Sequence, residues 1–333
     1  MTTATATPSR KLPAYDGSSR ALPWNVLGGD LTTSHPTVDA ALEATGLDYD
    51  VQVLQSAAIL PDGTVLDSGP QFRQIVRPDP AGGYMVIGQS GTRMTPIHNR
   101  DAFQVANELA AKHEATIKGA CDYQHGRVSV MVVGLGVIDL NGGQDAVDLN
   151  LLIRNPHDGS GALSLSLTPF RPACTNAVHA SISAAKRTWK ISHTPNAQGR
   201  VDLATSALIA ALNYRDAFQV KAEALIQQAV TAAEFAKIVA GLYPIAEGKE
   251  DTVAGQRRLE TREKIAHLHR TSPTLEGVRD TAWGAYSAVT EYLDWYRPVR
   301  GEAAAARATA QLDEHNPYAK ASARVWDRFA AMV

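Results

Sequence analysis

The character of the chain changes once, near residue 172, and this change limits the folds open to it. Before residue 172, short runs rich in β-branched and apolar residues are separated by turn signals such as PDG, PDPAGG and HDG. Runs of this kind are typical of antiparallel hairpins. After residue 172, Ala-rich segments broken by Pro are typical of helices. The sequence therefore predicts an α+β fold, with an antiparallel β-sheet and helices in the N-terminal half and a mostly helical C-terminal half.

The same patterns predict individual elements and a division of the chain. We expect strands within 51–60, 72–77, 84–88, 126–140, 147–154 and 162–167. We expect helices at 36–45, from Asn99 as N-cap to 113, and at 173–190, 202–229, 231–241, 250–270, 275–296 and 303–331. Residues 1–22, rich in Thr, Ser, Ala and Pro, are predicted to be a flexible lead-in. An α+β core domain is expected at 23–200 and a helical region at 201–333.

Charge is distributed unevenly along a nearly neutral chain. The sequence has 32 basic and 34 acidic residues, so its net charge alone predicts no nucleic-acid or membrane partner. Between Asp158 and Asp202, however, there is no acidic residue. The basic residues in this interval are Arg171, Lys186, Arg187, Lys190 and Arg200. We therefore expect an anion-binding surface formed by these five side chains.

The segment 170–194 also contains a cysteine and two histidines. We predict a helix that starts near Thr175, with Trp189 on its buried stripe. Cys174 would lie at the helix start, where His179 points roughly 140° away around the axis at 100° per residue. A Cys–His nucleophilic pair is therefore not expected, and we predict that Cys174 is structural.

Metal, cofactor and membrane binding are not expected. The chain has two cysteines without the paired spacing of a structural zinc site, and no run of eighteen apolar residues. We therefore expect a cytoplasmic protein with no cofactor and no metal.

Three short motifs suggest chemistry but fit ordinary structure better. GLGVIDLNGG, at 134–143, does not open a helix as a dinucleotide-binding loop would, so a bulge and a turn are expected. The HDGS motif at 157–160 is expected to be a hairpin turn, because adjacent residues cannot form a catalytic triad. His267 and His269, two apart on a helix, are expected on the surface.

A set of motifs spread over roughly residues 22–330 points to a family. They comprise Arg77 and Asp79 after a strand, Asn99 and Phe103 in a helix, His157 and Asp158 in a turn, Arg171, Cys174 and Asn176 in an RPACTN block, and His193 before Thr194. The chain resembles the phage/plasmid-like proteins, an uncharacterised family of phages, prophages and plasmids. Residues 280–300 are similar to its C-terminal segment, with Ser287 and Trp295 where Asn and His are common. These motifs name no reaction.

The resemblance implies an association with mobile DNA and, if phage-encoded, a place in the host cell cytoplasm. The first hypothesis is a protein that binds single-stranded DNA in recombination or annealing, with the five basic residues at phosphates and Trp189 or a nearby aromatic side chain at a base. A homo-oligomer remains open. The second is an enzyme acting on a nucleotide or another phosphorylated small molecule, with Arg77, Arg171 and Asn176 at the anion and His157 or His193 as acid or base. The third is binding to a host protein. We expect binding without catalysis and assign no catalytic residue.

Overall fold

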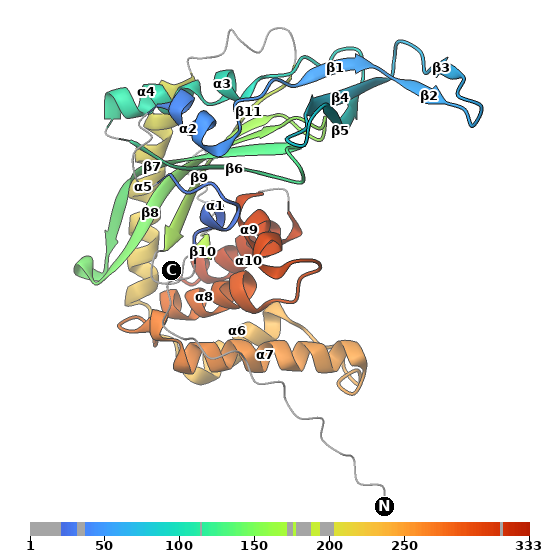
Figure 1. Ribbon diagram of the computed structural model, residues 1–333. Coiled ribbons are helices and arrows are strands. Elements are labelled where there is room, and N and C mark those ends of the chain that lie inside the picture. The colour runs from blue at the N-terminus through green and yellow to red at the C-terminus, as the bar shows by residue number, and fades with distance from the viewer. Residues whose placement is uncertain are drawn as a thin grey trace, which may run out of the picture.

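A six-stranded antiparallel sheet, which we call the main sheet, forms the centre of the fold (Figure 1). The computed structural model describes residues 21–31, 37–113, 115–171, 176–177, 188–193, 203–313 and 316–333. The strands of the main sheet are β6 (Thr116–Tyr123), β7 (Val128–Leu140), β8 (Asp145–Pro156), β9 (Leu163–Arg171), β10 (Asn176–Ala177) and β11 (Thr188–Ile191). Their order is β10-β9-β8-β7-β6, and β11 pairs with β9 on the same edge as β10.

The long hairpin β7–β8 is built as its sequence predicts. Its strands pair from Val128 opposite Pro156 to Leu140 opposite Asp145, with a register shift between Gly134 and Val137. A turn at Asn141–Gly143, where the backbone takes positive φ, joins the two strands. The expected bulge and turn in GLGVIDLNGG are therefore confirmed.

Two smaller sheets extend to one side of the main sheet (Figure 1). The three-stranded sheet, which we call the small sheet, has the order β1 (Gln52–Gln55), β4 (Arg73–Pro78) and β5 (Tyr84–Ser90). The hairpin of β2 (Ala57–Ile59) and β3 (Val65–Asp67) continues beyond it. We call residues 56–72, which hold this hairpin and its connections, the arm.

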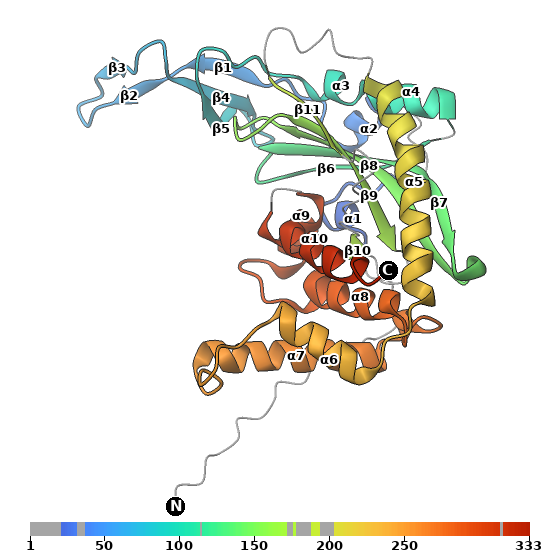
Figure 2. The same cartoon turned by 180° about the vertical axis from the view of Figure 1, so that it is seen from behind.

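Helices occupy both faces of the main sheet. The N-terminal helices are α1 (Pro23–Val26), α2 (Val38–Thr45), α3 (Asn99–Ala102) and α4 (Gln104–His113). The later helices are α5 (Leu203–Gln227), α6 (Ala232–Leu242), α7 (Val253–Thr271), α8 (Ala282–Glu291), α9 (Ala303–Leu312) and α10 (Pro317–Ala330). A 3₁₀ turn, Pro273–Leu275, precedes α8, and a π-helical segment, Tyr292–Tyr296, follows it. Figures 1 and 2 both place α6 and α7 at the end of the molecule away from the main sheet.

One large hydrophobic core runs from α2 through the main sheet to α10. On the opposite face of the sheet, Trp24 of α1 packs edge-on against Phe170 of β9, and Leu312 of α9 joins this second cluster. Because both faces are covered, β8 and β9 are buried on both sides along almost their whole length. The predicted α+β class is confirmed.

Two local predictions are wrong. The predicted helix 173–190 is replaced, where the structure describes it, by strands β10 and β11. Trp189 and Ile191 are buried while Lys190 between them is exposed, and this two-residue period suits a strand that pairs with β9. Tertiary pairing thus overrides the helical propensity of the Ala-rich sequence. Asn99 is not an N-cap: His98 holds that position, and Asn99 is buried inside the first turn.

Candidate functional site

Asn99 stands at the centre of a buried polar network between α3 and the main sheet. Its Nδ2 donates hydrogen bonds to the Leu47 carbonyl, at 3.0 Å, and to Ser129 Oγ, at 3.1 Å. These two bonds fix Asn99 Oδ1 as an acceptor. It accepts from Asn155 Nδ2 at 3.1 Å and from His157 Nε2 at 2.9 Å. His157 therefore carries a proton on Nε2.

The surroundings of His157 favour a neutral imidazole. Burial lowers its pKa to about 3, and the charges of His193, His98 and Arg77 act in the same direction. Burial likewise lowers the pKa of His193 to about 4. His193 Nδ1 accepts a hydrogen bond from the Ile97 amide at 3.3 Å, beside the Ile97 carbonyl that binds Asn155. At neutral pH both imidazoles are therefore uncharged, with His157 a donor to Asn99 and His193 an acceptor from the Ile97 amide.

Arg77 closes the network on the side of the small sheet. Its Nη1 donates to Asp122 Oδ2 at 2.9 Å, and its guanidinium lies 3.9 Å from the centroid of the Tyr49 ring. The Tyr49 hydroxyl lies 3.0 Å from Ser129 Oγ, which joins Arg77 to Asn99 through two side chains. Gly126 leaves the space that the guanidinium fills, since a Cβ there would collide with it. We call these side chains together the seam network: Tyr49, Arg77, Asn99, Asp122, Ser129, Asn155 and His157.

The turn after His157 fastens the small sheet to the main sheet. A Cβ on Gly88 of β5 would overlap the Asp158 backbone, and Gly159, at φ +80°, lies against the Gln89 carbonyl. Asp158 Oδ1 accepts from the Ser160 amide at 3.0 Å, so HDGS forms the expected hairpin turn. These contacts make the motif a structural junction between the two sheets.

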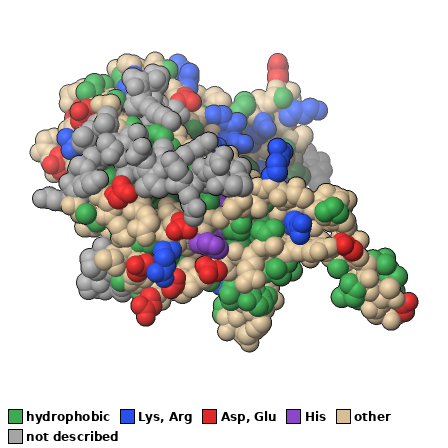
Figure 3. Space-filling model, turned by 90° about the horizontal axis from the view of Figure 1, so that it is seen from above, with side chains coloured by type: hydrophobic (Ala, Val, Ile, Leu, Met, Phe, Trp, Pro, Cys, Tyr) green, Lys and Arg blue, Asp and Glu red, His purple; other side chains and the backbone are tan. Residues whose placement is uncertain are grey.

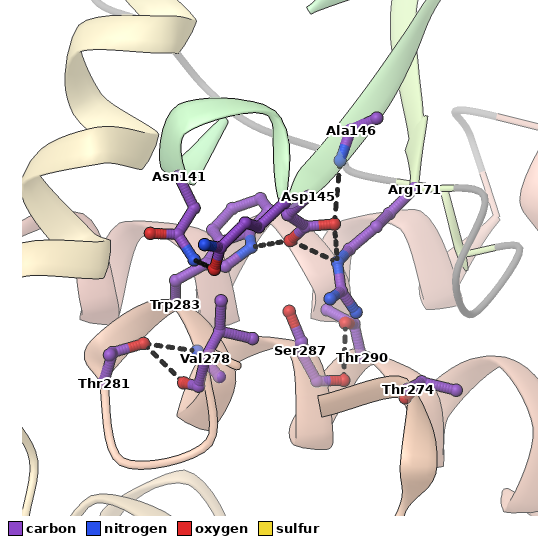
Figure 4. Close-up of polar contacts among 12 residues, drawn as sticks. Asn141, Asp145, Ala146, Arg171, Thr274, Val278, Thr281, Trp283, Ser287 and Thr290 are labelled. Carbon is purple, nitrogen blue, oxygen red and sulfur yellow. Dashed lines mark hydrogen bonds and ion pairs between the residues drawn. The ribbon is translucent and has the colours of Figure 1, made fainter. Parts of the chain in front are cut away.

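A second buried network lies at the other end of β8 (Figure 4). Arg171 Nε donates to both oxygens of Asp145, at 3.1 and 2.9 Å, and Trp283 Nε1 of α8 donates to Asp145 Oδ2 at 2.8 Å. The Ala146 amide donates to Asp145 Oδ1 at 2.9 Å. Arg171 is only 3% exposed. The expectation that Arg171 meets phosphates at the surface is therefore wrong, because its charge is buried and paired inside the protein.

Two buried carboxylates near this second network escaped the sequence analysis. Glu291 accepts hydrogen bonds from Ser272 Oγ, at 2.9 and 3.1 Å, and from Thr274 Oγ1 at 2.7 Å. Asp294, three residues later in the π-helical segment, is also buried. The sequence did contain a signal for them, because two acidic residues occur inside the apolar, aromatic stretch 282–296. Acidic side chains are almost never buried unless they are paired, so this position predicts hydrogen-bonding partners. Figure 4 shows Ser287 and Thr290 on the side of α8 that faces the Asp145 network.

The two networks are far apart. Asp145 and Asn155 lie ten residues apart on β8, which corresponds to roughly 33 Å at about 3.3 Å per residue. Arg171 is paired with Asp145 at the start of β8, whereas Arg77 is paired with Asp122 of β6, whose neighbour Ser129 in β7 lies opposite Asn155. The small-molecule hypothesis requires Arg77 and Arg171 to bind the same anion, and their separation rules out such a shared site.

The other predicted residues have varied places. Asp79 accepts from the Ala81 amide in the β4–β5 turn, and Phe103 is fully buried in the core. Lys190 is exposed on β11, but Trp189 is buried and offers no face to a base. His267 is exposed as expected, whereas His269 is buried against Phe235 and hydrogen-bonded to the Arg279 carbonyl, so its surface assignment is wrong. Lys186, Arg187, Arg200 and Cys174 lie outside the described residues, as does the side chain of Asn176 in β10.

The described residues include no group of three or more His, Cys, Asp and Glu side chains arranged to hold a metal ion. Among the same residues, no helix is both long and apolar enough to cross a membrane.

Comparison with known families shows that most residues of both networks lie in one family domain. The model of the family described as "Domain of unknown function (DUF932)" matches residues 86–315, more than half of the chain. The chain belongs to this family. No curated protein and no solved structure matches the chain. The DUF932 match includes Asn99, His157, Arg171 and Glu291, so both networks lie mostly within the family domain, whereas β1 to β4 precede it.

Proposed function

We propose that this DUF932 protein binds nucleic acid, with single-stranded DNA as the favoured ligand, and acts in recombination or annealing on a mobile genetic element. The observation that carries the proposal is the acid-free interval between Asp158 and Asp202. Arg171 is neutralised by Asp145, so the proposal rests on the other four basic residues of that interval: Lys186, Arg187, Lys190 and Arg200. Phosphate contacts by Lys and Arg supply most of the affinity of sequence-independent binding.

Of these four basic residues, Lys190 lies within the described part of the chain and supports the proposal. It is exposed on β11, between the buried side chains of Trp189 and Ile191. β11 lies on an edge of the main sheet, and its outward positions, Thr188 and Lys190, are polar, as is Ser192 directly after the strand. An edge with a lysine and neutral hydrogen-bonding side chains suits a phosphate backbone better than an apolar partner.

A gel-shift titration with single- and double-stranded DNA at several salt concentrations tests this proposal. If four cations contact phosphates of a single strand, log affinity should fall with log salt with a slope of roughly −3, at about −0.7 per contact. The variant Lys186→Glu/Arg187→Glu/Lys190→Glu should weaken binding for every sequence and bring the slope to about −0.7, because one cation remains.

A matched control separates local contact from net charge. Lys237, Arg257 and Arg270 are exposed on α6 and α7, which both figures place far from β11. Changing these three to Glu alters the net charge by the same amount and should leave the affinity within a few fold. A parent protein that binds no DNA at low salt, or a control variant that loses as much affinity as the first, would refute the proposal.

The second hypothesis, an enzyme acting on a phosphorylated small molecule, gains less support. Both arginines assigned to the anion are buried and paired with acids, and they lie at opposite ends of β8. The neutral, buried His157 supports the structure of the junction between the sheets.

A further inference from the structure

The exposed apolar side chains of this protein are concentrated in one part of the chain. Of the twelve large hydrophobic residues exposed among the described residues, eight fall between residues 54 and 86. They are Leu54, Ile59, Leu60, Val65, Leu66, Phe72, Tyr84 and Val86. All lie on the arm or on the small sheet from which it extends, and Figure 3 shows hydrophobic side chains gathered on the arm at the right of the view. Single exposed apolar residues are common, but such a concentration marks an interaction surface.

The arm forms a regularly paired hairpin although little covers it. β2 and β3 pair from Ala57 opposite Asp67 to Ile59 opposite Val65, and every residue of the two strands is exposed. Hydrogen bonds close both ends of the hairpin: Leu60 N donates to the Thr64 carbonyl at 2.9 Å, and Gln55 Nε2 donates to Asp67 Oδ2 at 2.5 Å. A two-stranded hairpin on its own is marginally stable in water. Covering Ile59, which is 75% exposed, and Val65, which is 64% exposed, with an apolar partner would stabilise this hairpin.

We propose that the partner is a second copy of this chain, and that the arms of two copies pack antiparallel about a two-fold axis. The available area supports this. An aromatic side chain buries roughly 150–250 Å², so the eight large apolar side chains, two of them aromatic and all about half exposed, offer at most on the order of 700 Å², a total that includes Leu66 on the face of the hairpin opposite to Ile59 and Val65. A standard protein interface buries roughly 800 Å² per partner.

Charge sets the direction of the pairing. Residues 51–72 contain Asp62 and Asp67 and no Lys or Arg. Asp67 is held by Gln55 and by the Gly69 amide, whereas Asp62 stands in the turn at the tip of the arm. Arg73 follows at the base of the arm, in β4. An antiparallel arrangement places the tip of each arm beside the base of the other, so Asp62 of one copy faces Arg73 of the second. A parallel arrangement would instead bring the two Asp62 carboxylates together.

The proposal goes beyond nucleic-acid binding and rests on other residues. The arm precedes the residues that match the DUF932 family, so it is a feature of this chain that the family domain does not include. It is also distinct from β11, which lies on the main sheet.

Sedimentation velocity of the full chain over a range of concentrations tests the proposal. The parent should sediment as a dimer at about 10 μM, and Ile59→Glu/Val65→Glu should sediment as a monomer. Val220→Glu/Val253→Glu is the matched control, because these two valines are equally exposed on α5 and α7, and it should remain dimeric. Far-UV circular dichroism should show unchanged secondary structure in both variants, since none of the four side chains is buried.

A charge exchange tests the direction. Asp62→Lys and Arg73→Glu should each raise the dimer dissociation constant several fold, and Asp62→Lys/Arg73→Glu should restore it. A parent that stays monomeric at 100 μM, or an arm variant that dimerises as well as the parent, would overturn the proposal. If Ile59→Glu/Val65→Glu is monomeric but Asp62→Lys/Arg73→Glu does not restore the dimer, the antiparallel arrangement would be overturned.

Discussion

At the scale of single residues, Asp145 is the buried counter-ion of a buried arginine. Its carboxylate balances the buried guanidinium of Arg171 and accepts from Trp283. We predict that Asp145→Asn lowers the free energy of unfolding by about 3–5 kcal/mol, because it leaves a buried charge without its counter-ion. Urea denaturation followed by tryptophan fluorescence measures this loss.

Asp148→Asn on the same strand is the matched control. Asp148 pairs with Lys118 where both side chains are partly exposed, so its replacement should cost only about 0–1 kcal/mol. Combining Asp145→Asn with Arg171→Met should recover part of the loss, since the uncompensated charge disappears. Equal losses in the two single variants would show that the Arg171–Asp145 pair is not essential to stability.

His157 and His193 predict a dependence of stability on pH. Their pKa values in the folded protein, about 3 and about 4, lie below the unfolded value of about 6.5. The unfolded state therefore binds more protons below pH 6.5, and stability must fall as the pH decreases from about 6.5 toward 4. Each histidine should contribute a loss of up to about 2 kcal/mol at pH 5.

His157→Gln isolates one share of this effect. The glutamine amide can still donate to Asn99 Oδ1 but binds no proton, so the variant should lose less stability between pH 7 and pH 5 than the parent. His267→Gln, on the exposed face of α7, is the matched control substitution. The measurement is the urea midpoint at each pH, and a His157→Gln curve parallel to the parent curve would contradict the assignment.

At the scale of elements, the sequence predicted the structure that neighbouring residues determine, and it did not predict the structure that depends on contacts with distant residues. The strands of the β7–β8 hairpin and the turn between them were predicted because alternation and turn residues are local. β11 was not, because its four residues gain their conformation from β9, more than twenty residues earlier in the chain. The two buried polar networks were not predicted from the sequence for the same reason. Asn99 meets His157 across 58 residues, and Asp145 meets Trp283 across 138, and no spacing in the sequence encodes such contacts.

The strand conformation of β11 predicts a pattern of mutational effects with a period of two. Trp189→Ala should cost about 3–5 kcal/mol and Ile191→Ala about 2–5 kcal/mol, because both side chains are buried in the large core. Lys190→Ala, between them, should stay within about 0.5 kcal/mol. Urea denaturation gives all three values. A Lys190→Ala loss as large as that of Ile191→Ala would contradict the strand.

At the scale of the whole molecule, the open question is whether residues 23–200 and 201–333 are separate units, as the sequence suggests, or unfold together. The contacts of the described structure favour a joint transition. Trp283 of α8 is bonded to Asp145 of β8, and Phe218 of α5 packs against both Trp283 and Trp326. The large core includes residues from both sides of position 200. Separating the halves would expose these aromatic side chains, each of which buries roughly 150–250 Å².

We therefore predict one cooperative transition. In hydrogen exchange with increasing urea, peptides from β8 and from α10 should become exchangeable with the same free energy and the same denaturant dependence, because neither half keeps its core without the other. Asp145→Asn should lower both values equally, although its substitution lies in β8 alone. The exposed turn residues 246–248, between α6 and α7, should exchange fast in all conditions and supply the internal reference. Two separate transitions, with α10 retaining protection after β8 has lost it, would instead establish a boundary near residue 200.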